Sequence, residues 1–288
     1  MPTYNYNAYF LVEEIHKQLL ETNNVFEIIC VDDGSQSSLN SENNKINNLS
    51  SSRFIELTEN IGRSAIRNLL IKESNFNWLL FLDADGFPVS DNFIQDYIEI
   101  IKNNLFKPKV FCGGRKHRDL KNSLRTSFGI KREEVLVEKR KKEPYRYFFT
   151  SNFLATREIF NEVNFYENLT TYGYEDYFIG KQLEKQGIKV VHIDNPVFHE
   201  QIEDNEAFIE KTKQGLENLM FLKKNFPEDF RQMKLLKVFN FFEQTFLIHF
   251  LKNKHIYFAK KAVETSLLIY FDLFRISYLD YLQRRKNR

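Results

Sequence analysis

The chain has 288 residues, of which 42% are hydrophobic and 28% charged, the composition of an ordinary globular protein with one large α/β domain or one domain plus an appended module. Forty-one lysines and arginines oppose 39 aspartates and glutamates, so no global positive field marks a nucleic-acid binder and no nucleic-acid partner is expected. Two cysteines cannot form a disulfide framework. MPTYNYNAYF lacks a signal-peptide pattern and no apolar run reaches about 18 residues, so a cytoplasmic protein is expected.

Short apolar runs and helical periodicities alternate through the first 82 residues. FEIICV at 26–31 and WLLFL at 78–82 each stop at an aspartate- and glycine-containing turn, as buried strands do. The expected elements are a helix at 9–20, a strand at 26–31, a polar stretch at 35–52, a strand at 53–57, a helix at 63–73 and a strand at 78–82. This alternation predicts a mixed, mostly parallel sheet flanked by helices, with a ligand site at the carboxyl ends of the strands.

The second half of the chain continues the pattern with one interruption. The expected elements are a helix at 91–102, a strand at 109–113, a helix at 156–162, a turn at 172–174, a helix at 175–185, a last strand at 189–193 and helices beyond 203. Between residues 115 and 146, twelve basic residues face five acidic ones, which predicts a long, partly mobile excursion from the sheet. The expected domains are an α/β domain over 1–202 and a helical, aromatic-rich extension over 203–288.

The strongest chemical signal is Asp83-Ala84-Asp85, directly after an apolar strand. Residues two apart on a strand lie on one face, so both carboxylates can meet one ligand. Carboxylate and diphosphate oxygens suit Mg²⁺ or Mn²⁺. An ordinary turn is the alternative, because aspartate and glycine favour turns. An EF-hand is not expected, because Gly86 comes too early and no glutamate closes a twelve-residue loop.

Three other segments carry features of a ligand site when they are considered together with this one. Asp33 ends the earlier strand, where it can reach a base or ribose from the same sheet edge. The segment 59–68 opens a helix with a glycine turn and two arginines, as an anionic ligand needs. Glu175-Asp176 begin another helix behind the turn Tyr172-Gly173-Tyr174. Each segment alone is weak evidence.

Together and in this order, the segments resemble the family 2 glycosyltransferases, which have the nucleotide-diphospho-sugar transferase fold called GT-A. The resemblance runs from Met1 to about Glu200 and rests on Pro2-Thr3-Tyr4-Asn5, Val31-Asp32-Asp33-Gly34-Ser35, Asn60-Ile61-Gly62, Ala65, Arg67-Asn68, Phe81-Leu82-Asp83-Ala84-Asp85, Asn152-Phe153 and Glu175-Asp176. It implies a GT-A catalytic domain over 1–202 that moves a hexosyl or N-acetylhexosaminyl group from a nucleotide-diphospho-sugar, expected to be UDP-linked, to an acceptor hydroxyl with inversion.

The resemblance also implies a set of donor-binding residues: Pro2, Thr3, Tyr4, Asp33, Asn60, Gly62, Arg63, Arg67, Asp83, Ala84 and Asp85. Asp33 would pair with the base, Asp83 would contact the ribose or a metal-bound water, and Asp85 would bind the divalent cation, Mn²⁺ or Mg²⁺. Arg63 or Arg67 would support the diphosphate, with a structural role in the helix as the alternative for Arg67.

For the acidic pair, the resemblance implies that Asp176 is the catalytic base and that Glu175 orients the acceptor. The alternative is an N-terminal helix cap, which the position of the pair also fits. His199, placed just beyond the expected last strand, corresponds to a metal-binding histidine in some relatives, so the expected metal set is Asp85, Asp83 and His199. A lone histidine is also commonly structural or exposed, and this applies to His192 inside the strand as well.

The chain departs from the family at its beginning. Relatives carry a five- or six-residue apolar strand before the Pro2-Thr3-Tyr4-Asn5 motif, whereas here Met1 directly precedes Pro2. Such a strand lies within the sheet, so its loss would expose two strand edges. The expectation is therefore that the first strand is truncated, with the true start upstream or another segment filling its place. The 172–174 turn also lacks the tryptophan of many relatives.

The C-terminal extension is rich in aromatic residues and ends in basic ones: Phe239, Phe241, Phe242, Phe246, Phe250, Tyr257, Phe258, Tyr270, Phe271, Phe274, Tyr278, Arg284, Arg285, Lys286 and Arg288. These residues suit a homodimer surface or a peripheral contact with the inner face of the cytoplasmic membrane, where a lipid-linked acceptor would be met. The alternative is that the aromatic residues pack on the catalytic domain and the basic tail is solvated.

The expected function is synthesis of a cell-surface polysaccharide or glycolipid, with a glycan or a lipid-linked acceptor. One alternative is a GT-A-like scaffold that binds a nucleotide sugar or a partner without turnover. Another is a haloacid-dehalogenase-type phosphatase with Asp83 as nucleophile, but that family needs Thr or Val where Phe87 stands.

Overall fold

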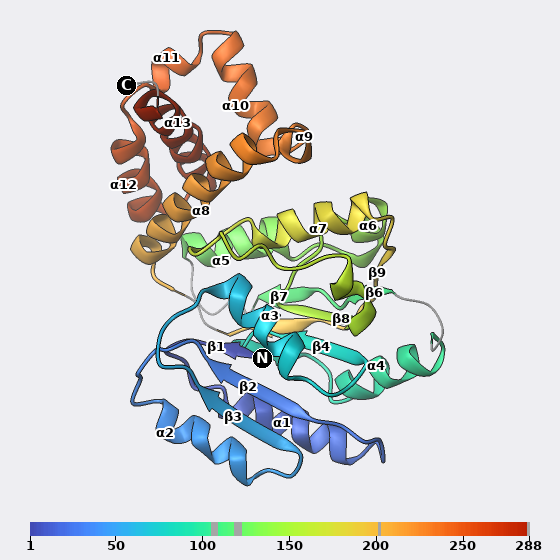
Figure 1. The fold of residues 1–288 in the computed structure, drawn as a ribbon. Helices are drawn as coiled ribbons and strands as arrows, with labels where there is room; N and C mark the ends of the chain where they lie inside the picture. The colour runs from blue at the N-terminus through green and yellow to red at the C-terminus, as the bar shows by residue number, and fades with distance from the viewer. Residues whose placement is uncertain (105–108, 118–122, 201–202, 287–288) are drawn as a thin grey trace. The chain divides into compact units, whose positions relative to one another are not determined.

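The computed structural model describes residues 1–104, 109–117, 123–200 and 203–286. The chain divides into two compact units. The first comprises Met1–Arg118, Glu133–Thr170 and Glu175–Gln201, and the second comprises Asp119–Arg132, Thr171–Tyr174 and Ile202–Arg288. Every strand that the structure describes belongs to the first unit (Figure 1). The domain boundary expected at 202/203 stays a prediction.

The strands of the first unit form three small sheets. The first sheet has the order β1 (Pro2–Thr3), β2 (Ile28–Asp32), β3 (Ser52–Glu56), all parallel. The second has the order β4 (Trp78–Leu82), β8 (Asn152–Thr156), β6 (Val110–Cys112), β9 (Val190–His192), and the third β5 (Gly86–Pro88), β10 (Val197–His199), β7 (Arg115–His117). Parallel and antiparallel pairings occur together, so the expected mixed α/β architecture is confirmed.

Helices cover both faces of β2 and β4. The helical segments of the first unit are α1 (Tyr9–Leu20), α2 (Asn40–Asn43), η1 (Asn44–Asn48), α3 (Arg63–Glu73), α4 (Phe93–Lys102), α6 (Val137–Lys142), η3 (Arg157–Asn161) and α7 (Glu175–Lys185). Side chains of α1 and α4 share a core cluster with Ile28, Cys30 and Leu82, and α3 packs on the opposite face of β2. Both faces are therefore apolar, which explains the uninterrupted hydrophobic runs of these two strands.

The beginning of the chain forms part of the first sheet. Pro2 pairs with Val31 in β2, and the Met1 amine donates a 2.8 Å hydrogen bond to the Ile29 carbonyl oxygen. β1 is only two residues long. Among the described strands it pairs with β2 alone, while β4 pairs with β8 alone. Among the described strands, β1 does not bridge β2 and β4, and the truncation expected from the sequence stays a prediction.

Two expectations about the second half are wrong. Residues 189–193 are not the last strand, because β10 follows and pairs with β5 and β7; three residues are too few for a recognisable apolar pattern. The described part of the basic excursion carries β7 and α6, and the buried Arg140 side chain donates hydrogen bonds to the carbonyl oxygens of Cys112 and Ile193. Its Arg118 and Lys121 lie outside the described residues.

The second unit is helical. Its helices are α5 (Leu124–Phe128), α8 (Asn205–Asn225), α9 (Pro227–Phe230), α10 (Lys234–Gln244), α11 (Ile248–Leu251), α12 (His255–Thr265) and α13 (Leu268–Lys286), and a π-helical segment, η2 (Gly129–Glu133), follows α5 across the unit boundary. Phe208 and Phe271 stack at 5.1 Å between ring centroids, with Phe128 against both. Ser266, in the left-handed conformation, separates α12 from α13. The helical character expected beyond 203 is confirmed.

The aromatic residues of the extension divide between core and surface. Phe239, Phe258, Phe271, Phe274 and Tyr278 are buried, whereas Phe241, Phe246, Phe250 and Tyr257 are more than half exposed. In the basic tail, Arg284 pairs with Asp280, and Arg288 lies outside the described residues. Within the described part of the chain, no helix is both long and apolar enough to span a membrane.

Candidate active site

The turn after β2 is held by its own carboxylates. Asp33 accepts hydrogen bonds from the backbone N–H groups of Ile61 at 2.8 Å and Gly62 at 3.1 Å, which fixes the loop that begins α3. Burial raises the pKa of Asp33, although these two hydrogen bonds oppose the rise. Gly34 has φ +67°, and a Cβ there would lie 2.2 Å from the Glu59 carbonyl carbon. A close backbone approach therefore requires glycine at position 34, and Asp33 bonds to the loop that begins α3.

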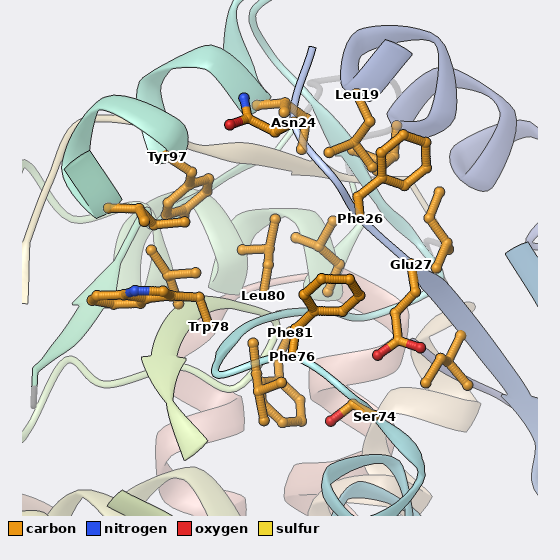
Figure 2. Close-up of a pocket in the computed structure, with 18 of the residues that line it drawn as sticks. Leu19, Asn24, Phe26, Glu27, Ser74, Phe76, Trp78, Leu80, Phe81 and Tyr97 are labelled. Carbon is orange, nitrogen blue, oxygen red and sulfur yellow. The ribbon is translucent and has the colours of Figure 1, made fainter. Parts of the chain in front are cut away.

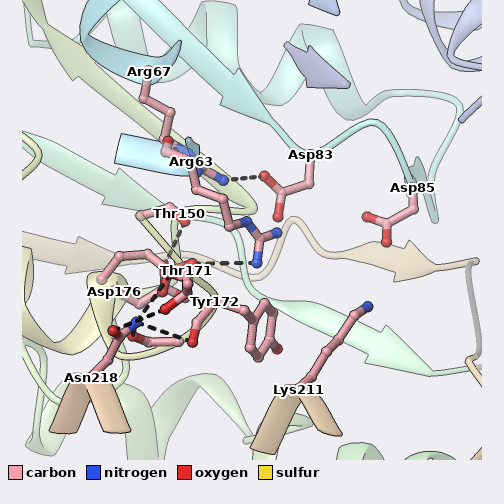
Figure 3. Close-up of polar contacts among 12 residues, drawn as sticks. Arg63, Arg67, Asp83, Asp85, Thr150, Thr171, Tyr172, Asp176, Lys211 and Asn218 are labelled. Carbon is pink, nitrogen blue, oxygen red and sulfur yellow. Dashed lines mark hydrogen bonds and ion pairs between the residues drawn. The ribbon is translucent and has the colours of Figure 1, made fainter. Parts of the chain in front are cut away.

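A buried ion pair joins α3 to the end of β4. Arg67 is 1% exposed and donates a 2.5 Å hydrogen bond to Asp83 Oδ1 (Figure 3). Burial raises the pKa of Asp83, but the positive charges of Arg67, Arg63 and Arg115 outweigh it and hold that pKa below its usual value. Asp83 is therefore an ionised carboxylate with one oxygen already occupied.

The next carboxylate is held differently. Asp85 Oδ2 lies 3.2 Å from His199 Nε2, because β5 and β10 bring Gly86 opposite His199. Burial and the nearby charge of Asp83 raise the pKa of Asp85 to about 6. Each side chain is 19% exposed, so the pair is reachable from solvent.

These residues can hold a divalent cation only if a bound diphosphate supplies further oxygen atoms. Among the described residues, no group of three His, Cys, Asp or Glu side chains could hold a metal ion. Asp85 and His199 supply one carboxylate and one imidazole side by side, while Asp83 is bonded to Arg67. Mg²⁺ and Mn²⁺ sites commonly combine one or two protein ligands with phosphate oxygens and water. The donor set therefore suits a cation that arrives with a diphosphate.

Asp176, which the sequence predicts to be the catalytic base, lies in the first turn of α7. Thr150 Oγ1 donates a 2.6 Å hydrogen bond to Asp176 Oδ1 (Figure 3). Arg115 lies 3.7 Å from Asp176 Oδ2. Burial and the charge of Glu175 raise the pKa of Asp176 to about 6, against the opposing effects of Arg115 and the Thr150 hydrogen bond. A carboxylate with such a pKa is ionised at neutral pH and remains basic enough to accept a proton.

Two arginines connect the carboxylates to one another. Arg63 lies 3.4 Å from Glu175, and its charge also lowers the pKa values of Asp83 and Asp85. Arg115 acts on the same two carboxylates and on Asp176, and its guanidinium lies over the Phe149 ring at 4.1 Å. Asp83, Asp85, Glu175 and Asp176 therefore belong to one electrostatic cluster, which we call the carboxylate cluster.

Sequence reasoning missed several members of this region. Arg115 and His117 were assigned to a mobile excursion, yet β7 places His117 opposite His199, with the rings 5.7 Å apart. Thr150 carried no motif. Tyr6, directly after the matched Pro2–Asn5 segment, is half-buried, and burial, Asp85 and Glu200 raise its pKa. Only Tyr6 had a usable signal, its proximity to that motif.

The other predicted residues lie in strands or loops of the first unit. Pro2 and Thr3 lie beside Val31 and Asp32 in the first sheet, and Tyr4 is 58% exposed. Ala84 lies between the two aspartates, and Asn60 is an exposed loop residue. His192 is buried away from them, bonded to Arg140 and to the Pro144 carbonyl oxygen, and burial lowers its pKa to about 4. His192 is therefore structural.

The Tyr/Gly turn belongs to the second unit and is held there by one amide. Asn218 Nδ2 donates hydrogen bonds to the carbonyl oxygens of Thr171, Tyr172 and Gly173 at 3.1–3.2 Å (Figure 3). Lys211 lies 5.6 Å from the Tyr172 ring centroid. Gly173 has φ +106°, and a Cβ there would lie 2.8 Å from the Gly215 Cα. Only glycine fits at this crossing of turn and helix.

Residues 1–164 match the sequence model of the family described as Glycosyl transferase family 2. The match spans more than half of the 288 residues, and the chain belongs to this family. No curated protein matches the chain. The match confirms the expected family and GT-A fold. The chain therefore does not belong to the haloacid-dehalogenase-type phosphatases that were the alternative. The ion pair between Arg67 and Asp83 also leaves Asp83 poorly suited to act as a nucleophile.

Solved structures with the same fold are distant in sequence. A mannosyltransferase, PcManGT from Pyrobaculum calidifontis in complex with GDP-Man and Mn²⁺, is 16% identical with a TM-score of 0.53, over 77% of this chain and 62% of that one. S. aureus TarS 1-349 in complex with UDP-GlcNAc is 17% identical with a TM-score of 0.50, over 98% and 90%. This chain covers only 38% of a longer TarS chain, with a TM-score of 0.49.

Proposed function

We propose that this glycosyltransferase moves a hexosyl or N-acetylhexosaminyl group from a nucleotide-diphospho-sugar to an acceptor hydroxyl, with inversion at the anomeric carbon. The observation that carries the proposal is the carboxylate cluster, in which an ionised Asp83, the Asp85–His199 pair and a raised-pKa Asp176 share the charges of Arg63 and Arg115.

Donor binding is assigned to the carboxyl ends of β2 and β4. Asp33 already accepts two backbone hydrogen bonds, and a carboxylate offers about four acceptor sites, so it can also accept from the N–H of a base. The donor of one structural relative is GDP-linked and that of another UDP-linked. We propose UDP for this chain.

Asp85 and His199 are the residues that would hold Mn²⁺ or Mg²⁺. Such a cation, when bound, neutralises charge on a departing diphosphate. Arg63, with its side chain 40% exposed, is the nearby positive charge that we propose to face the same phosphates. Arg67 is the structural partner of Asp83, because it is buried and already bonded at both Asp83 and the Arg63 carbonyl oxygen.

Asp176 is proposed to remove the proton from the acceptor hydroxyl. The hydrogen bond from Thr150 fixes the carboxyl plane through Oδ1 and leaves Oδ2, beside Arg115, to face the acceptor. The attacking oxygen then bonds to the anomeric carbon while the bond from that carbon to the diphosphate breaks. Glu175, held by Arg63, is proposed to orient the acceptor.

The acceptor is proposed to be a glycan or lipid-linked sugar of a cell-surface polysaccharide or glycolipid, handled at the inner face of the cytoplasmic membrane. The exposed Phe246 and Phe250 and the basic Arg285 of the second unit are the groups available for a peripheral membrane contact or a homodimer.

A donor panel tests the proposal. UDP-sugars and GDP-mannose are screened by thermal shift with and without Mn²⁺, and hits are assayed for hydrolysis and transfer. We expect a metal-dependent shift with UDP-sugars that Asp85→Asn abolishes and the exposed Asp91→Asn preserves. Turnover with an inverted anomeric product by NMR supports the mechanism. Binding without turnover would favour the scaffold alternative, and absence of any nucleotide binding would refute the proposal.

A further inference from the structure

The turn Gly113-Gly114 carries the chain from the second sheet to the third, because β6 ends at Cys112 and β7 begins at Arg115. Arg115 therefore follows the turn directly. Its guanidinium lies 3.7 Å from Asp176 Oδ2 and 3.5 Å from Glu133 Oε2. The side chains that hold the turn therefore help to place a positive charge beside the proposed base.

One arginine binds the turn from the side of α6. Arg140 donates hydrogen bonds from Nη1 to the Cys112 carbonyl oxygen at 3.1 Å and from Nη2 to the Gly113 carbonyl oxygen at 3.2 Å. The same guanidinium bonds to the carbonyl oxygens of Ile193 at 2.8 Å and Val135 at 3.0 Å. Its planar fork of donors thus joins the end of β6 to the segments that follow β9 and precede α6.

The histidine at the end of β9 also contacts this guanidinium. Arg140 Nη1 lies 3.1 Å from His192 Nδ1, and His192 Nε2 lies 2.9 Å from the Pro144 carbonyl oxygen. An arginine can only donate and a carbonyl oxygen can only accept, so the ring carries its proton on Nε2. Burial lowers the pKa of His192 to about 4, so the ring is neutral. It therefore accepts a hydrogen bond from Arg140 without repelling it.

A second contact reaches the turn from β8. Asn152 Nδ2 donates hydrogen bonds to the carbonyl oxygens of Gly114 at 3.0 Å and Asn195 at 2.9 Å. Its Oδ1 accepts a 2.6 Å hydrogen bond from the Tyr97 hydroxyl. Figure 2 shows Tyr97 among the residues that line an apolar cavity of about 420 Å³, to which β2 and β4 also contribute. The hydroxyl of Tyr97 therefore fixes the orientation of the amide that holds Gly114.

The turn has no space for side chains. A Cβ at Gly113 would lie 2.2 Å from the Asn195 carbonyl oxygen. At Gly114, which has φ +91°, a Cβ would lie 2.7 Å from Arg140 Nη2. Glycine at both positions lets the backbone approach its neighbours this closely. The turn therefore cannot move without a movement of the groups packed around it.

Arg140 is an expensive residue to bury. Burial lowers its pKa, and its hydrogen-bond acceptors in the described part of the chain are carbonyl oxygens and a neutral ring nitrogen. A buried charge commonly adds little stability compared with an apolar side chain of similar size. It does fix the geometry of every group that it bonds. Holding the turn is therefore the effect to which Arg140 is best suited.

We propose that Arg140 is a positioning residue for the transfer reaction: acting through the Gly113-Gly114 turn, it holds the Arg115 guanidinium beside Asp176. The inference rests on the proposed role of Asp176 as the base. With the turn held, Arg115 favours the ionised carboxylate that accepts the proton of the acceptor. When the turn is released, Arg115 withdraws and the carboxyl group of Asp176 binds its own proton more tightly.

The test follows the titration of Asp176 in the free protein, so it needs neither donor nor turnover. Arg140→Lys keeps the charge but replaces the planar fork with a single ammonium group. The side-chain carboxyl ¹³C resonance of Asp176 is assigned from its absence in Asp176→Asn and followed by NMR against pH. We expect the midpoint in Arg140→Lys to rise by about half a pH unit. An unmoved midpoint would overturn the proposal.

Arg157→Lys is the matched control. Arg157 also bonds to backbone carbonyl oxygens, but it follows the opposite end of β8 from Thr150, which bonds to Asp176. Arg157→Lys should lower Tm while leaving the midpoint of Asp176 in place. An equal rise of the midpoint in both variants would mean that general loosening of the first unit causes it, and would overturn the proposal.

A double variant decides whether Arg140 acts through Arg115. Arg115→Gln alone should raise the midpoint of Asp176, because the charge of Arg115 lowers that pKa. Adding Arg140→Lys to Arg115→Gln should then move the midpoint no further. Shifts that add in the double variant would show that the two arginines act independently, and would overturn the proposal.

Arg140→Gln replaces Arg140→Lys if the lysine variant does not fold, because a glutamine amide keeps hydrogen-bond donors and buries no charge. Its effect must also vanish in the Arg115→Gln background, which separates loss of position from loss of charge. With donor and acceptor present, the acid limb of kcat should follow the NMR midpoint. A moved midpoint without any sugar transfer would support the placement of Arg115 by Arg140 and would refute the proposed function.

Discussion

At the carboxyl end of β4, Asp83 meets a buried guanidinium at 2.5 Å, whereas along the body of the same strand Leu80 lines an apolar cavity. In the first region, polar groups form hydrogen bonds with one another: Asp33 with Ile61 and Gly62, and Asp176 with Thr150. The second leaves strand edges without a partner in the described part of the chain. The comparison indicates that the polar groups at the end of β4 are already paired within the first unit, whereas the cavity along the strand is lined mainly by apolar side chains.

The largest expected effect is a loss of catalytic rate in a variant that keeps the size and contacts of the carboxylate cluster. Asp176→Asn keeps the size and the Thr150 contact but removes the base, so kcat should fall about 10²–10⁴-fold. Donor binding by thermal shift should change little. Asp91→Asn, an exposed carboxylate, serves as the control. A loss of less than about tenfold would assign the base to another residue.

Removing one member of the buried ion pair tests how far the carboxylate cluster supports the fold. Arg67→Met leaves Asp83 without its main partner and should lower the free energy of unfolding by about 3–5 kcal/mol. Urea denaturation measures it. The double variant Arg67→Met with Asp83→Asn should recover much of the loss, because no buried charge remains unpaired. A double variant as unstable as Arg67→Met would show that packing of Arg67, and not its charge, matters.

The turn after β2 is predicted to tolerate no side chain. Gly34→Ala adds a Cβ 2.2 Å from the Glu59 backbone at φ +67° and should cost about 2–4 kcal/mol of stability. Gly187→Ala is the matched control, because Gly187 has φ +65° with nothing within 4 Å of its Cβ position, so it should cost only about 1–2 kcal/mol. Equal losses in urea denaturation would mean that the turn rearranges.

The smallest effect concerns pH. The pKa of Asp176 is raised to about 6, and the base works only when ionised, so kcat at saturating donor and Mn²⁺, with Asp85 held ionised by the cation, should rise with pH through about 6 and then level off. Arg115 lowers this pKa, so Arg115→Gln should move the acid limb to higher pH, with activity about three- to tenfold lower at pH 6 and nearly unchanged at pH 8. Lys116→Gln, on the same strand, is the control. An unmoved acid limb would exclude Arg115 as the group that tunes Asp176.

Much of the fold near the motifs was predictable from local pattern. The helices at 9–20, 63–73 and 175–185 and the strand at 78–82 have the expected bounds, because apolar periodicity and turn residues act over a few neighbouring positions. The expected Asp83, Asp85, Glu175 and Asp176 do share one cluster of charges.

The remaining features depend on pairings between distant segments. β7 and β10 are three residues each, too short for a periodic signal, yet their register places His117 opposite His199 and brings Arg115 to Asp176. Arg140, one of a run of basic residues, is buried because carbonyl oxygens of β6 and the segment after β9 accept its hydrogen bonds. No local pattern distinguishes it from its exposed neighbours.

The sequence by itself determined the family, the strand and helix order around the motifs and the identity of the acidic residues, since these follow from residue type and short-range spacing. Only the tertiary structure decided which carboxylates are bonded, which arginine is buried and how the described strands pair. Those properties depend on burial and on hydrogen bonds between residues far apart in the chain, such as Thr150 with Asp176 and Met1 with Ile29.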